Sequence, residues 1–65
     1  MSITTKELEK VGEQLLSEQV LIKKYRTFSS LCSDTELKKK LGEIADKHQQ
    51  HFNTLLGFLQ YWRGK

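Results

Sequence analysis

Three side chains in this sequence could together bind a metal ion: Glu18, His48 and His51. The two histidines are three residues apart, so they share one face of a helix. That face is also the apolar face of its segment, with Leu41, Ile44, Ala45, Phe52 and Leu55. An imidazole or carboxylate on a buried face must be hydrogen-bonded, paired or bound to a metal. A glutamate with two histidines is a usable ligand set for zinc, iron or manganese, so these residues are the candidate metal site.

The first of the two elements that must position these residues is a helix expected over about residues 5–32. It opens with a Thr-x-x-Glu capping box from Thr4 to Glu7. Apolar residues then recur at steps of three and four, which is typical of an amphipathic helix. They are Leu8, Val11, Leu15, Leu21 or Ile22, Tyr25, Phe28 and Cys32. The same spacing places Glu18 on or beside this apolar stripe, either pointing inward or reaching water from its edge.

The second element is a helix expected over about residues 35–62. Ser33 and Glu36 form a second capping box, with Asp34 as a competing N-cap. The apolar stripe of this helix includes the histidines: Leu37, Leu41, Ile44, His48, His51 or Phe52, Leu55, Phe58 or Leu59, and Trp62. A short link between two long helices favours an antiparallel pair. The sequence therefore predicts an all-α fold in which residues 1–65 form a single helical hairpin.

Antiparallel pairing about a turn near residues 33–34 sets residue i opposite a residue near 67 minus i, because both helices rise equally per residue. Glu18 is then opposite Gln49, with His48 and His51 about half a turn away on either side. Tyr25 is opposite Gly42, a large side chain against a gap. The hairpin thus brings the one inward acidic residue of the first helix to the level of the two histidines.

Composition excludes several classes of protein. The net charge is +3, and the only basic cluster, Lys38–Lys40, has acidic neighbours, so we expect a solvated helix face and no nucleic-acid binding. The single cysteine, Cys32, cannot form an internal disulfide and suits a reducing compartment. We expect no signal peptide and no membrane span, and hence a cytoplasmic protein. Tyr61 and Trp62 are the best candidates for an exposed aromatic contact.

The hairpin cannot bury both apolar stripes by itself, because two helices leave part of each stripe in contact with water. Pairing two hairpins closes the core of a four-helix bundle. We therefore expect a homodimer, in which a two-fold axis repeats every site residue. The core of such a bundle would contain two glutamates and four histidines.

Two resemblances to known families support this architecture. The Glu18-x6-Tyr25 spacing resembles the first helix of the ferritin-like superfamily, whose second helix carries Glu-x-x-His; here that motif reads Ala45-x-x-His48, without the carboxylate. The chain is also similar to short spore coat proteins of the coat protein F-like family of spore-forming Firmicutes. That similarity covers residues 1–8, 18–25 and 45–56. It implies a ferritin-like helical bundle deposited in or near the spore coat, with other coat proteins as partners.

Two functions from different classes follow from these observations. The first is a structural or assembly protein of the spore coat that acts as a helical-bundle homo-oligomer, and this is the function we expect. The second is a metal-binding or metal-dependent redox protein on a reduced ferritin-like bundle, with iron, zinc or manganese at Glu18, His48 and His51. A purely structural role for the histidines, hydrogen-bonded to Glu18 and glutamine side chains, fits the first. We expect no enzyme, because no nucleophile has an adjacent base and no phosphate-binding loop is present.

Overall fold

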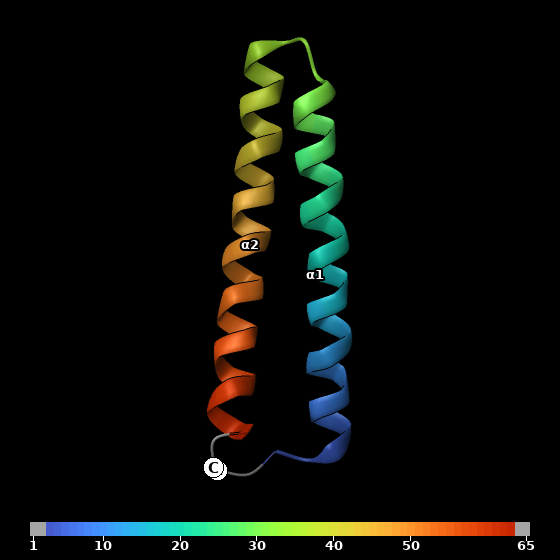
Figure 1. Ribbon diagram of the computed structural model, residues 1–65, viewed down its shortest axis with the longest axis vertical. Coiled ribbons are helices and arrows are strands. Elements are labelled where there is room, and N and C mark those ends of the chain that lie inside the picture. Colours follow the sequence, from blue (N-terminus) through green and yellow to red (C-terminus); the bar gives the residue numbers. More distant parts are fainter. Residues whose placement is uncertain (1–2, 64–65) are drawn as a thin grey trace.

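The structure is a computed structural model that describes the backbone of residues 3–63 and the side chains of residues 3–61. Two helices, α1 (Thr5–Leu31) and α2 (Thr35–Arg63), pack side by side in opposite directions. The described residues contain no strand. Figure 1 shows the connecting turn at one end of the rod, with the start of α1 and the end of α2 at the other. The predicted all-α helical hairpin is therefore confirmed.

Local hydrogen bonds explain where the helices begin. At the start of α1, the Glu7 amide donates to Thr4 Oγ1 at 3.1 Å and the Thr4 amide donates to Glu7 Oε1 at 3.0 Å. The predicted capping box is thus confirmed, and its backbone hydrogen bond lowers the pKa of the Glu7 carboxyl. At the start of α2, the Leu37 amide donates to Asp34 Oδ1 at 2.8 Å. Asp34, the competing N-cap in the sequence, therefore caps α2.

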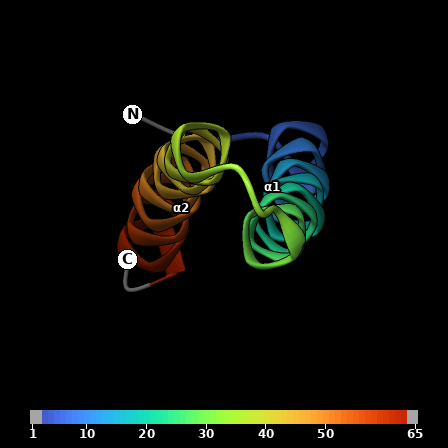
Figure 2. The same ribbon diagram turned by 90° about the horizontal axis from the view of Figure 1, so that it is seen from above.

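The core between the helices is thin. Among the described residues, only Leu15 and Ala45 are buried hydrophobic side chains, and Glu18 is the one buried charged residue. Figure 2 shows α1 and α2 inclined to each other when viewed from above. The rod measures 47 × 15 × 13 Å, so most side chains can reach solvent. A hairpin of this shape stabilises itself through one seam of partly buried contacts.

One predicted contact between the helices differs in the structure, that of Tyr25. A Cβ on Gly42 would lie 3.8 Å from Ser29 Oγ, and the Tyr25 ring instead stacks on His48. The predicted pairing of Tyr25 with Gly42 is therefore wrong. Side chains on a helix lean toward its N-terminus. In this antiparallel pair Tyr25 leans away from the turn and His48 leans toward it, so the two rings meet.

The remaining expectations concern the surface and the two ends of the rod. Neither helix, over its described residues, has a stretch that is apolar enough to cross a bilayer. Cys32 is half-buried, and it lies at the turn, away from the histidines. The Tyr61 side chain is exposed, while the side chain of Trp62 and residues 64–65 lie outside the described part.

Candidate metal centre

The three predicted ligands meet near the middle of the hairpin. Glu18 comes from α1, while His48 and His51 come from consecutive turns of α2. His48 Nδ1 lies 2.9 Å from Glu18 Oε2, and His51 Nδ1 lies 3.7 Å from the same oxygen. One potential ligand atom from each residue can be chosen so that all three lie within 4.8 Å of one another. Among the described residues, Glu18, His48 and His51 are the group of three or more histidine, cysteine or acidic side chains that could hold a metal ion.

Glu18 is the buried member, with 4% of its surface exposed. A buried carboxylate must be hydrogen-bonded, and this one has partners on both oxygens. Gln14 Nε2 donates to Oε1 at 3.1 Å, and His48 lies within hydrogen-bond distance of Oε2. Because an ionised carboxylate only accepts, His48 Nδ1 carries the shared proton. The bond with His48 holds the pKa of the Glu18 carboxyl below its usual value, against the opposing effect of burial.

Aromatic contacts hold His48 in place. The Tyr25 ring is stacked on the His48 ring with 6.0 Å between centroids and 6° between planes. The Phe28 ring is perpendicular to the Tyr25 ring, with 6.4 Å between their centroids. His51 is perpendicular to His48, also at 6.0 Å. Tyr25 therefore fixes the plane of one candidate ligand, while Glu18 fixes the identity of its protonated nitrogen.

His51 differs from the other two because 68% of its side chain is exposed. It lines a shallow groove at the side of the hairpin, together with Gln14, Glu18, Thr54 and Leu55. Ligand atoms around a tetrahedral zinc ion are roughly 3.3 Å apart. The three side chains must therefore close inward to bind an ion, and the exposed imidazole of His51 is the one with room to rotate. The groove gives the ion a path from solvent.

The chemistry of the donor set fits a divalent transition metal. Two imidazole nitrogens and one carboxylate oxygen are ligands of zinc, and the same set occurs in non-haem iron sites that keep positions open. The ferritin-type arrangement needs a further carboxylate three residues before His48. Ala45 occupies that position and is fully buried. The three donors are therefore suited to a single ion, with at least one coordination position left for another ligand.

Sequence reasoning missed two parts of this site. Gln14 supplies the second hydrogen bond to Glu18, and its signal was available in the i, i+4 spacing from Gln14 to Glu18. Tyr25 stacks on His48, which no spacing rule within one helix could reveal, because the contact joins residues of different helices.

Comparison with known proteins adds no further evidence about this site. No family model, curated protein or solved structure matches the chain. The expected relationship to spore coat proteins therefore stays a prediction.

Proposed function

We propose that this protein binds a divalent first-row transition metal ion through Glu18, His48 and His51. The observation that carries the proposal is the convergence of the three donor atoms within 4.8 Å, from two helices, around a buried carboxylate. Such a carboxylate beside two imidazoles is suited to replace its shared proton with a cation. Gln14 and Tyr25 act as positioning residues, because they hold Glu18 and His48 rather than the ion.

The test is a titration of protein made without an affinity tag, with Co²⁺ followed by its visible absorption. We expect saturable binding by the wild type and at least about a hundredfold weaker binding by His51→Ala. The exposure of the His51 side chain means that this variant should keep its helix content, which circular dichroism measures. Gln49→Ala is the matched control, because Gln49 lies on the same turn and bonds to Asn53 instead. A wild type that binds no Co²⁺, or a His51→Ala variant that binds as well, would overturn the proposal.

A second candidate is the assembly role that the resemblance to spore coat proteins implies. Large apolar side chains exposed along the rod favour it, because such side chains mark contact surfaces. In this role two hairpins form a four-helix bundle, which then joins other coat proteins. Sedimentation velocity of metal-free protein tests the first step: we expect a dimer, and a monomer at all concentrations would refute the assembly role.

A further inference from the structure

The two long flanks of the hairpin differ in the side chains they present. We call one the His51 flank, defined by Gln14, Leu21 and Phe28 on α1 and by Leu37, Ile44, His51 and Phe58 on α2. Gln14 and His51 line the same groove, which places the stripes of both helices on one side of the rod. Members of each stripe are seven residues apart, so they follow nearly the same line along their helix. Lysine side chains accompany these stripes: Lys10 and Lys40 lie eighteen residues, or five helical turns, before Phe28 and Phe58, and Lys24 Nζ lies 5.8 Å from the centre of the Phe28 ring.

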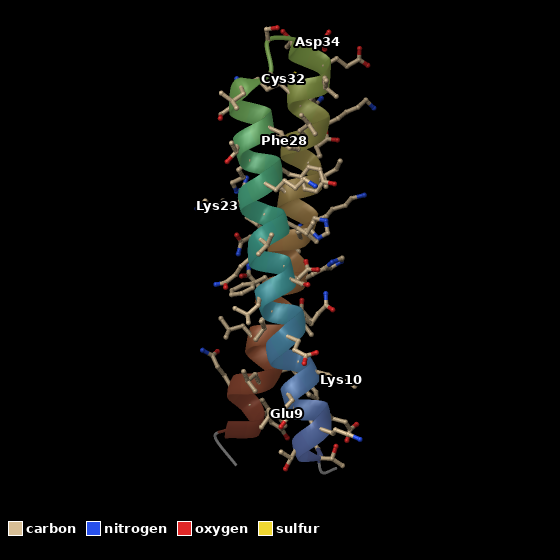
Figure 3. All side chains as sticks on the ribbon, turned by 90° about the vertical axis from the view of Figure 1, so that its right-hand side faces the viewer. Glu9, Lys10, Lys23, Phe28, Cys32 and Asp34 are labelled. Carbon is tan, nitrogen blue, oxygen red and sulfur yellow. The ribbon has the colours of Figure 1, made fainter. Side chains whose placement is uncertain are left out.

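The opposite flank, which we call the Arg26 flank, is polar. Two open hollows along it are lined mainly by polar residues: Gln19, Ile22, Lys23, Gln49 and Phe52 in one, and Arg26, Ser29, Ser30, Lys38 and Gly42 in the other. Figure 3 shows Lys23, which belongs to the Arg26 flank, labelled at the left edge of α1. Association through the Arg26 flank would bury the polar residues that line these hollows, whereas association through the His51 flank would bury its apolar stripes while the long lysine side chains beside them extend to water.

The area that the chain exposes suggests what covers the His51 flank. Compact monomers of 7.6 kDa expose roughly 4,300 Å². This chain exposes 5274 Å². The excess of about 1,000 Å² is close to the roughly 800 Å² that each partner buries in a standard protein–protein interface. One partner of similar size, on one flank, would therefore bring the exposed area to the ordinary range.

The position of the candidate ligands indicates that this partner is a second copy. Ile44 and Phe58 lie seven residues before and after His51 on the same stripe. A two-fold axis through the level of His51 and normal to the flank therefore places Ile44 of each copy against Phe58 of the other. The same axis brings the two His51 side chains together at the centre. Four-coordinate zinc needs one ligand more than the three that a single chain supplies.

We propose that the His51 flank is the docking surface for a second copy of this chain, and that the second copy's His51 completes the coordination of a metal ion held by Glu18, His48 and His51. In that arrangement the ion lies beside the two-fold axis and uses both His51 side chains, so the equivalent position on the other chain lacks a His51 ligand and the dimer holds one ion for two chains. Metal binding and dimerisation then strengthen each other, because the completed site exists only in the dimer. This inference rests on the proposed metal binding, and it adds the surface, the partner and the stoichiometry.

The test compares a substitution on the His51 flank with a substitution on the outer surface of α1. Ile44→Lys places a charge on the His51 flank, where the wild-type side chain is 38% exposed. Leu16→Lys is the matched control on the outer surface of α1, where the side chain is 65% exposed. If exposed apolar surface alone drove association, the control would have the larger effect. Sedimentation equilibrium gives the mass with and without Co²⁺, and Co²⁺ absorption gives the stoichiometry.

For the wild type and Leu16→Lys, we expect a dimer with one Co²⁺ per two chains, and dimerisation at least about tenfold tighter with Co²⁺. For Ile44→Lys, we expect a helical monomer and at least about tenfold weaker Co²⁺ binding. Leu37→Lys, on the same flank at a more exposed position, gives the same comparison if Ile44→Lys does not fold.

The outcomes separate the two proposals. One Co²⁺ bound per monomeric wild-type chain would overturn the docking surface and leave the proposed function standing. Equal effects of Ile44→Lys and Leu16→Lys on the dimer would also overturn the docking surface. A wild type that binds no Co²⁺ would overturn both.

Discussion

The two flanks of the hairpin are built from the same two helices, yet their side chains make different contacts. On the Arg26 flank the helices close their contacts within one chain: Arg26 pairs with Asp46 at 3.2 Å, and Ser29 Oγ donates to the carbonyl of Lys38 at 2.9 Å. On the His51 flank apolar side chains and an imidazole face outward. A polar surface whose hydrogen bonds are formed is stable in contact with water. Removing an apolar surface from water, by contrast, lowers the free energy.

The difference teaches where to look for function in a small helical protein. The contacts of the Arg26 flank join the two helices at Arg26 and Asp46 and at Ser29 and Lys38. The His51 flank, together with the buried Glu18 beside it, is the part that packing alone does not require. Replacing a buried charged pair by apolar residues often leaves a protein as stable or more so. Stability alone therefore does not explain a glutamate–histidine layer in a thin core.

The largest change is expected beside the His51 flank, at Tyr25. Tyr25→Ala removes the ring that stacks on His48 and meets Phe28, so it should lower the free energy of unfolding by roughly 2–3 kcal/mol. Urea unfolding followed by circular dichroism on metal-free protein measures this loss. Lys23→Ala, an exposed position on the Arg26 flank, is the control. If both substitutions cost the same, the aromatic contacts do not hold the site, and the contrast between the flanks loses its energetic basis.

A smaller effect of opposite sign is expected at Gly42 on the Arg26 flank. Gly42→Ala should raise the free energy of unfolding by up to about 1 kcal/mol, because alanine is the better helix former. The added Cβ would meet Ser29 Oγ at 3.8 Å, an ordinary contact. Thermal unfolding of the variant checks this, with Gly57→Ala as control, where a Cβ would meet nothing within 4 Å. A destabilised Gly42→Ala alongside a stabilised Gly57→Ala would mean that the helices approach more closely on this flank than the structure indicates.

The smallest effect is expected for the ion pair on the same flank. Arg26→Ala should change the free energy of unfolding by less than about 0.5 kcal/mol, since the Arg26 and Asp46 side chains are 49% and 65% exposed and water screens their attraction. Urea unfolding at low and high salt tests this, and the difference between wild type and variant should shrink further at high salt. A loss of several times this size would show that the ion pair, rather than the seam between the helices, fixes the register.

Much of the fold could be read from the residues. The Thr4–Glu7 capping box, the stripe from Leu8 onward and the short polar link near Asp34 predicted a hairpin, because each is a local signal with a local cause. The approach of Glu18 to the histidines also followed from equal helical rise. The predicted pairing of Tyr25 with Gly42 was wrong for a definite reason. Pairing residue i with a residue near 67 minus i matches the heights of Cα atoms along the rod, whereas long side chains reach about a turn beyond their own Cα.

The sequence by itself determined two helices, a tight turn and three side chains of metal-ligand type on stripes that face each other. Helical periodicity fixes the angle of every residue about its own helix axis, and that angle needs no partner. Only the tertiary structure decided that Tyr25 stacks on His48, that Gln14 completes the partners of Glu18, and that His51 is displayed on the apolar flank. These depend on the tilt and rotation of one helix against the other, which the packing of the whole seam sets.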